Sequence, residues 1–378
     1  MEQPVNPQPR RRRRRRGTRC LLVLATCLLA AAVVTPVASA RTLQKGFWGP
    51  AQIDGVSQFP TYKQLGVTLY QMALPWDTVA PTRPANPRDP ADPAYQWPAE
   101  IDGIINEARA NGMTVMLMII GAPAWANGGH TAEYAPTKSA DYANFARAAS
   151  RRYPAVRRWM IWGEPTRAHN WKPIITQPFG APLSHAAQAA PRRYARLLDA
   201  AYGQLKAQSR SNIVIGGNTF VTGEIRPTSW AHYMRLPDGR PPRMDLYGHN
   251  PFSFREPDLR KPPSVNGFVD FSDLRRFDAQ IQRDLGKPRH KRIRLFLSEF
   301  AIPTDVDFEL NFHVTPATQA KWITSAFKVA HQVHADTLGW IRLRDDPPDP
   351  QGRLVSHGGL MTADGTPKPG FFAFMRAS

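Results

Sequence analysis

The segment Arg-Trp-Met-Ile-Trp-Gly-Glu-Pro at residues 158–165 is an apolar run that ends on a charged residue. Successive side chains of a strand point to opposite faces, so Met160, Trp162 and Glu164 are predicted to share one face. A carboxylate at the end of a buried strand costs several kcal/mol of desolvation unless it is paired or takes part in chemistry. The segment therefore predicts a buried strand that carries Glu164 to an ion-paired or catalytic position.

A second segment has the same design. Residues 293–300 read Ile-Arg-Leu-Phe-Leu-Ser-Glu-Phe, and alternation places Leu295, Leu297 and Glu299 on one face. With so many arginines in the chain, either glutamate alone could be half of a structural salt bridge. Two glutamates at strand ends of one domain match the pair of carboxylates that glycoside hydrolysis requires, and this favours catalysis.

The rest of the chain alternates short apolar runs with longer helical stretches, which is typical of βα units and a parallel sheet. Eight strands are predicted, at residues 46–49, 67–74, 114–120, 156–162, 213–217, 244–249, 293–299 and 337–342. Helices are predicted at residues 99–111, 139–153, 191–209, 272–285 and 317–335, the last one capped by Thr315 and Pro316. The fold class is therefore α/β, a single (β/α)8 TIM barrel whose long loops lie on the C-terminal face, where active sites sit.

The first forty residues have the features of a signal peptide. An arginine-rich stretch at 10–16 precedes an apolar run at 20–34, and Ala38-Ser-Ala40 provides a small-residue cleavage pattern. An uncleaved membrane anchor is the alternative. We predict a signal peptide at 1–40 and one domain at 41–378, secreted or retained at the cell envelope.

Composition limits the function classes. The segment 1–40 holds eight arginines, one glutamate and both cysteines, so the formal charge of the remainder falls from +19 to +12. The positive charges are scattered and no nucleic-acid-binding motif is present, so no nucleic-acid partner is predicted; anionic envelope polymers stay open as partners. No metal-ligand spacing, phosphate-binding glycine loop or Gly-x-Ser-x-Gly motif occurs, and no cofactor is predicted.

Several segments resemble clan A glycoside hydrolases of the family 5 and family 39 type. Trp-Met-Ile-Trp-Gly-Glu-Pro at 159–165 is similar to their strand-four motif, and Leu-Phe-Leu-Ser-Glu-Phe at 295–300 is similar to their strand-seven motif. The resemblance extends from about residue 46 to the C-terminus, with further matches at 245–252, 339–340 and 359–370. It implies a retaining mechanism in which Glu164 is the general acid/base and Glu299 the nucleophile, with carboxyl groups ~5 Å apart.

The sequence departs from this family at two positions. Gly163 stands where the family carries an asparagine that binds the sugar 2-hydroxyl, and Asn218 or Asn250 is the candidate replacement. Phe252 lies where a tyrosine often hydrogen-bonds the nucleophile, and Tyr247 is the nearest substitute. These departures leave open a second hypothesis, a barrel that binds glycans without cleaving them.

Aromatic residues near predicted strand ends are candidates for the sugar-binding surface, because flat apolar rings match the C–H faces of sugars. The candidates are Trp48, Trp76, Trp125, Trp171, Trp230 and Trp340. The resemblance places Trp340 under the sugar at the cleavage point, and His249 is the histidine predicted to bind substrate. We therefore predict a monomeric, secreted glycosidase that acts on a polysaccharide or oligosaccharide.

Overall fold

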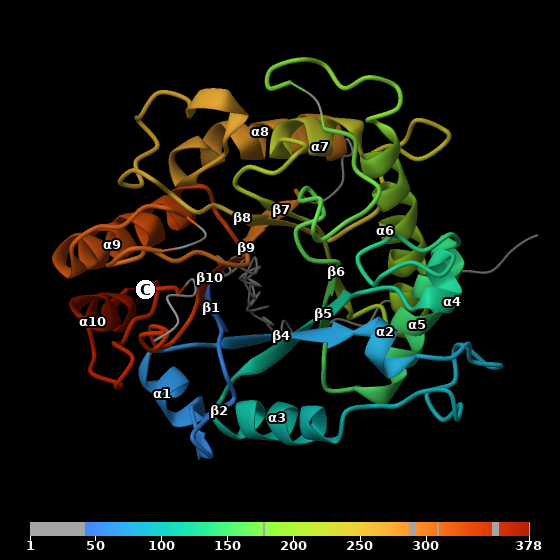
Figure 1. The fold of residues 1–378 in the computed structure, drawn as a ribbon, viewed down its shortest axis with the longest axis horizontal. Coiled ribbons are helices and arrows are strands. Elements are labelled where there is room, and N and C mark those ends of the chain that lie inside the picture. Colours follow the sequence, from blue (N-terminus) through green and yellow to red (C-terminus); the bar gives the residue numbers. More distant parts are fainter. Residues whose placement is uncertain (1–41, 177, 287–291, 308–309, 350–354, 378) are drawn as a thin grey trace, which may run out of the picture. The chain divides into compact units, whose positions relative to one another are not determined.

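The structure is a computed structural model, and it describes residues 42–377 except 177, 287–291, 308–309 and 350–354. The predicted signal peptide at 1–40 lies outside the described residues. Within the domain, strands alternate with helices and the helices surround the strands (Figure 1). No helix of the described part is both long and apolar enough to cross a membrane.

Eight parallel strands close into a barrel, as the sequence predicts. In chain order they are β1 (Gln44–Trp48), β4 (Leu69–Pro75), β5 (Thr114–Ile120), β6 (Arg158–Ile161), β7 (Ile213–Phe220), β8 (Leu246–Asn250), β9 (Arg294–Leu297) and β10 (Thr337–Ile341). Each strand pairs with its neighbours in sequence, and β1 pairs with both β4 and β10. The predicted (β/α)8 fold is therefore confirmed. A small antiparallel pair, β2 (Gln52–Ile53) and β3 (Val56–Ser57), was not predicted.

The five predicted helices are present with ends shifted by a few residues. They are α3 (Ala99–Ala110), α5 (Ser139–Arg152), α6 (Ala189–Gln208), α8 (Leu274–Leu285) and α9 (Pro316–Gln332). The Thr315 hydroxyl accepts a hydrogen bond from the Thr318 amide and caps α9 as predicted. Shorter elements that the sequence pattern missed are α1 (Phe59–Gln64), α2 (Trp76–Val79), α4 (Ala124–Asn127), α7 (Pro227–Tyr233), η1 (Val265–Gly267), η2 (Phe271–Asp273) and α10 (Pro369–Arg376).

Two hydrophobic cores result from the alternation along the strands. The barrel interior is filled by a small cluster of Leu69, Met116, Met160, Ile215, Leu246 and Phe296. A much larger cluster lies between the outer face of the strands and the helices. Apolar residues thus lie on both faces of the strands β4 to β9, as in other fully covered parallel sheets.

The N-terminal end of the barrel is built from buried ion pairs. Asp336 lies 2.7 Å from Arg158 and 3.1 Å from Arg294, and all three side chains are largely buried. A cavity of about 650 Å³ opens here. Because the carboxylates around this cavity are paired with neighbouring arginines and lysines, we assign this end of the barrel to stability.

At the C-terminal end, two long loops form a wall. Lys172, in the loop after β6, forms a bridge with Tyr134 of the β5–α5 loop, and its amide donates to Glu133 O at 2.9 Å. The Lys172 ammonium also lies 2.8 Å from the Glu133 carboxylate.

Candidate active site

Two cavities meet at the C-terminal ends of the strands, and both are lined by Glu164 and Glu299. The first measures about 400 Å³ and the second about 260 Å³. His169 and Asn170, from the turn after β6, also line both. The two glutamates predicted from strand ends far apart in the sequence are thus brought to one site, at the end of the barrel where active sites occur.

A tight turn after β6 sets the direction of Glu164. The strand ends at Ile161, and both Trp162 (φ +67°) and Glu164 (φ +42°) adopt left-handed backbone conformations. Such conformations are uncommon for bulky residues and occur where the surrounding structure enforces them, often at functional sites. The turn also breaks the predicted alternation, because Trp162 packs in the outer core whereas Met160 lies inside the barrel.

Side-chain donors from Arg167, Asn170 and Asn250 contact the Glu164 carboxylate. Arg167 Nη1 lies 2.9 Å from Oε2, Asn170 Nδ2 lies 3.4 Å from the same oxygen, and Asn250 Nδ2 lies 2.8 Å from Oε1. Glu164 is 9% exposed, so these contacts are only weakly screened by water. A guanidinium and two amides all favour the ionised form of the carboxyl group.

Glu299 follows β9 in a similarly abrupt way. Alternation puts Phe296 inside the barrel and Leu295 and Leu297 in the outer core, so the predicted common face of Leu295, Leu297 and Glu299 is wrong. The strand ends at Leu297, and the redirected chain brings Glu299 to both cavities. Glu299 reaches the site because it follows β9 at the C-terminal end of the barrel, and not because of the inward–outward alternation along that strand.

A buried hydrogen-bond network fixes Ser298, the residue before Glu299. Gln71 of β4 donates through Nε2 to the Ser298 carbonyl at 2.9 Å and accepts from its hydroxyl at 3.1 Å. Trp48 of β1 donates through Nε1 to the same hydroxyl at 3.1 Å. Trp48 is half-buried and packs against the barrel interior, so its ring lies at the predicted end of the barrel, where it braces the strand that carries Glu299.

An asparagine at the position of Gly163 would require the end of the Met118 side chain to move. A Cβ atom there would lie 2.9 Å from Sδ and 3.2 Å from Cε of Met118. Of the two predicted replacements, Asn218 is fully buried, with Nδ2 3.9 Å from Met118 Sδ, and it lines neither cavity. The Asn250 amide contacts the Glu164 carboxylate and does not line either cavity.

Most of the predicted aromatic platforms pack in the core. Trp340 is fully buried, with its ring edge-on to Phe300 at 4.7 Å and its Nε1 donating to Arg342 O. Trp76 stacks on Phe145 at 5.8 Å, and Trp125 bonds Ala80 O at 2.7 Å beneath the Arg83 guanidinium. Trp171 and Trp230 are fully buried as well. Trp340 and Trp76 are therefore buried away from both cavities, and the half-buried Trp125 lines neither of them.

The predicted roles of His249 and Tyr247 are also corrected. Both side chains point out of the barrel towards Phe277 of α8. The His249 ring bonds Thr219 Oγ1 at 2.8 Å and Val269 O at 2.9 Å, and burial lowers its pKa to about 4. Tyr247 is fully buried in the same layer, so neither residue reaches the cavities.

Residues that sequence reasoning missed supply much of the cavity wall. Arg167 stacks on Phe220 at 4.3 Å, and Phe220 packs on Phe252 at 5.4 Å. Phe252, which stands where the family often has a tyrosine, therefore forms part of an aromatic wall. The other missed lining residues include Asp77, Glu133, His169, Asn170, Asp307, Arg342 and Ser356. Only the nearness of 167–170 to Glu164 in the sequence signalled any of them.

The rim of the larger cavity is acidic. The hydrogen bonds from Lys172 and Thr131 lower the pKa of Glu133 to about 2, so this carboxylate is ionised. Asp77 of α2 lines the same cavity, whereas the smaller cavity carries Arg167 and Arg342. Among the described residues, no group of three or more His, Cys, Asp or Glu side chains is arranged to hold a metal ion.

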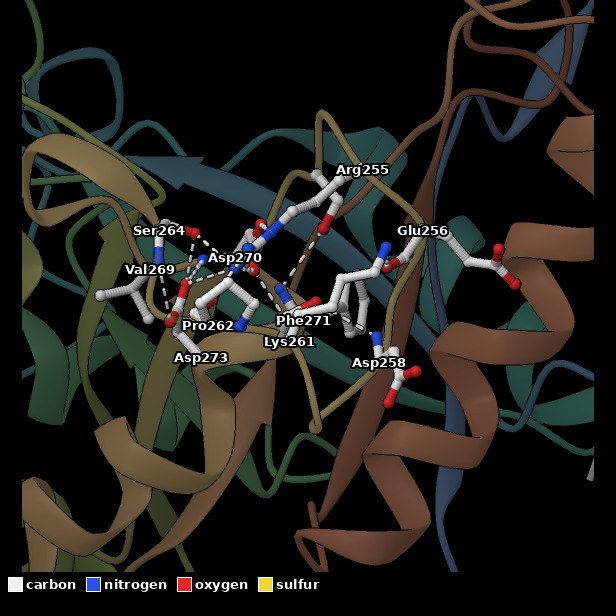
Figure 2. A network of polar contacts seen from close by, with 12 residues as sticks. Arg255, Glu256, Asp258, Lys261, Pro262, Ser264, Val269, Asp270, Phe271 and Asp273 are labelled. Atoms are coloured by element: carbon white, nitrogen blue, oxygen red, sulfur yellow. Dashed lines mark hydrogen bonds and ion pairs between the residues drawn. The ribbon is translucent and has the colours of Figure 1, made fainter.

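A polar network braces the loop between β8 and α8, which carries Phe252. Figure 2 shows Arg255 at its centre. Its Nε lies 2.6 Å from Asp270 Oδ2, and its Nη2 lies 3.2 Å from Asp273 Oδ2 and 2.7 Å from Ser264 Oγ. Asp270 also caps η2. The network ties both ends of the loop together next to the site.

Replacing Arg255 with methionine is expected to lower the free energy of unfolding by about 2 kcal/mol, because two buried carboxylates lose a charged donor. Burial by itself would raise the pKa of Asp273, but the hydrogen bonds from Arg276 and Ser264 hold it below its ordinary value. Its stabilisation is therefore present above pH ~4 and is lost as the pH falls through the lowered pKa. Urea unfolding at several pH values measures this difference, which should shrink in acid.

The matched control is Arg260→Met in the same loop. Arg260 is 90% exposed and its ion-pair partner among the described residues is the nearby Asp258, so this variant should change stability by less than ~0.5 kcal/mol. Equal losses in the two variants would show that the network has no special role.

Known structures share this fold. The chain aligns with a family 39 glycoside hydrolase from Bacteroides cellulosilyticus WH2 at 16% identity and a TM-score of 0.62, over 90% of this chain and 64% of that one. It aligns with a glucosidase from Croceicoccus marinus at 18% identity and a TM-score of 0.62, over 89% and 65%. A GH39 β-xylosidase from Caulobacter crescentus aligns at 19% identity and a TM-score of 0.55, over 89% and 70%.

The chain thus spans less than two thirds of the length of the first two of these proteins. No protein-family model and no curated protein sequence matches it. The predicted resemblance to clan A glycoside hydrolases is confirmed at the level of the fold.

Proposed function

We propose that the domain is a retaining glycoside hydrolase that cleaves O-glycosidic bonds of a polysaccharide or oligosaccharide. The observation that carries the proposal is the meeting of Glu164 and Glu299 at two adjoining cavities on the C-terminal face. Most glycosidases hydrolyse a glycosidic bond with two carboxyl groups that flank it. The shared fold of the family 39 structures supports the same activity.

In the proposed mechanism, Glu299 attacks the anomeric carbon while Glu164 protonates the departing oxygen. The bond to the leaving group breaks as the glycosyl–Glu299 ester forms. Glu164, now ionised, then takes a proton from a water molecule that attacks the same carbon and releases Glu299. The contacts from Arg167 and Asn250 suit Glu164 in this second step, where it must be ionised.

The test is product release by residues 41–378 from a panel of polysaccharides and aryl glycosides. Proton NMR of the first product then reports its anomeric configuration. We expect hydrolysis of at least one glycan, with the initial product in the configuration of the substrate. An initial product of inverted configuration would contradict the double-displacement mechanism, and no hydrolysis of any glycan would contradict the enzyme.

A barrel that binds glycans without cleaving them is the second candidate. The Arg167–Glu164 ion pair favours it, because the acid step needs a protonated Glu164. This hypothesis expects glycan affinity in calorimetry that survives Glu164→Gln and Glu299→Gln, with no turnover by any form. The enzyme hypothesis expects turnover by the wild type.

We further propose that residues 1–40 direct export and that the domain acts as a secreted monomer, free or held at the envelope by its basic surface. Detection of a mature N-terminus near residue 41 in the culture medium would support export. Retention through anionic polymers would show as envelope binding that weakens as salt is raised.

A further inference from the structure

We propose that Asn250 is a positioning residue for Glu164, whose amide group serves both protonation states of that carboxyl group by reversing its orientation. The inference rests on the proposed function and adds a residue to it. Asn250 Nδ2 lies 2.8 Å from Glu164 Oε1, and Asn250 is completely buried. A contact of this kind positions one carboxylate oxygen and sets the charge state of the group.

The backbone holds Asn250 firmly in place. It is the last residue of β8, where its register partner is Phe220 of β7. Strand alternation puts it on the same face as Leu246, which lies in the barrel interior. Rotation about the Cβ–Cγ bond therefore exchanges Nδ2 and Oδ1 while the side chain stays beside Glu164.

The carbonyl oxygen of the Asn250 amide provides the second observation. Asn250 Oδ1 is buried, and within the described residues no donor reaches it. Buried carbonyl oxygens are almost always hydrogen-bonded, so this one calls for an explanation. When Glu164 is protonated, it becomes a donor, and a half-turn of the Asn250 amide presents Oδ1 to that O–H group. An amide thus stabilises the ionised carboxylate through Nδ2 and the protonated acid through Oδ1.

Other charged and titratable groups surround Glu164 and stay constant in the test. They are Arg167 and His169 from the turn after β6, Glu299 after β9, Asp77 of α2, Glu133 of the β5–α5 loop, and Asp307 and Arg342 across the smaller cavity. Arg167 contacts Oε2 and Asn250 contacts Oε1, so a change at Asn250 removes a contact to Oε1. Any shift between variants is therefore assigned to the amide.

The decisive experiment is the pH dependence of kcat/KM for Asn250→Asp and Asn250→Leu. The alkaline limb reports the acid of the free enzyme. Asn250→Asp places a second carboxylate beside Glu164, so Glu164 should keep its proton longer and the limb should move up by about one pH unit or more. Asn250→Leu removes the donor without adding charge and should move the limb in the same direction by less.

Asn212→Asp is the matched control. Asn212 is also fully buried with an unpaired Oδ1, but it lies at the opposite end of the barrel and donates to Ser150 Oγ and Leu205 O. Its substitution should leave the alkaline limb unchanged. An unshifted limb in both Asn250 variants, with wild-type circular dichroism, would overturn the proposal.

A second measurement does not depend on turnover. Infrared difference spectra between each protein and its Glu164→Gln partner isolate the Glu164 carboxyl band during a pH titration. The midpoint should rise in Asn250→Asp, and an unchanged midpoint would refute the inference. A wild type that hydrolyses no glycan would contradict the proposed function, whereas this titration would still decide the role of Asn250.

Discussion

Replacing Glu299 with glutamine is expected to reduce kcat for aryl glycoside hydrolysis by roughly 10⁴-fold or more, a loss typical of a removed nucleophile. Glutamine keeps the size of the side chain but cannot form the glycosyl ester. Because Ser298 is held by Gln71 and Trp48, the strand end should keep its position in the variant. Steady-state kinetics with a chromogenic aryl glycoside measures the loss.

Two further measurements separate a nucleophile from a structural carboxylate. In Glu299→Ala, added azide should restore cleavage and yield a glycosyl azide of the opposite anomeric configuration, because azide attacks from the vacated side. Glu107→Gln, on α3, is the control for a glutamate outside the site and should keep wild-type kcat. Hydrolysis by Glu299→Gln at near wild-type rate would remove Glu299 from the mechanism.

The barrel itself was predictable because every buried parallel strand leaves an apolar run in the sequence. The runs at 67–74, 114–120 and 293–299 correspond to β4, β5 and β9 with shifts of a few residues at their ends. Short helix-to-strand links and long strand-to-helix loops likewise indicated which end of the barrel would hold the site. Both glutamates follow directly from this reasoning, since each stands two or three residues after the end of a strand.

What the pattern could not provide was the direction of side chains beyond the strand ends. Alternation holds only while the backbone is extended, and left-handed conformations at Trp162 and Glu164 end it. The location of the tryptophans was not predictable for another reason. In a barrel covered by helices, the outer strand face is as apolar as the inner one, so Trp340 could not be assigned to either from the sequence.

The polar surroundings of Glu164 were beyond prediction because they join distant segments. Asn250 comes from β8, 86 residues away along the chain, and Arg167 reaches Glu164 only through the turn that follows β6. Sequence reasoning proposed Asn250 for a sugar hydroxyl, whereas in the structure it contacts the carboxylate.

Replacing Glu164 with glutamine should produce a loss that depends on the leaving group. For a glycoside with a poorly acidic alcohol, loss of the general acid is expected to lower kcat/KM by about 10²–10⁴-fold. A dinitrophenyl glycoside, whose leaving phenolate needs no proton, should lose far less in this first step and should accumulate the glycosyl–Glu299 intermediate, because the base for the second step is missing.

Mass spectrometry of the quenched Glu164→Gln protein tests that accumulation directly. The alkaline limb of the pH profile should also disappear in this variant, since no acid remains to titrate. Arg167 and Asn250 lose their charged partner in the variant, so circular dichroism and thermal unfolding must accompany the kinetics. An equal loss for all leaving groups would assign Glu164 to binding and would favour the barrel that holds glycans without cleaving them.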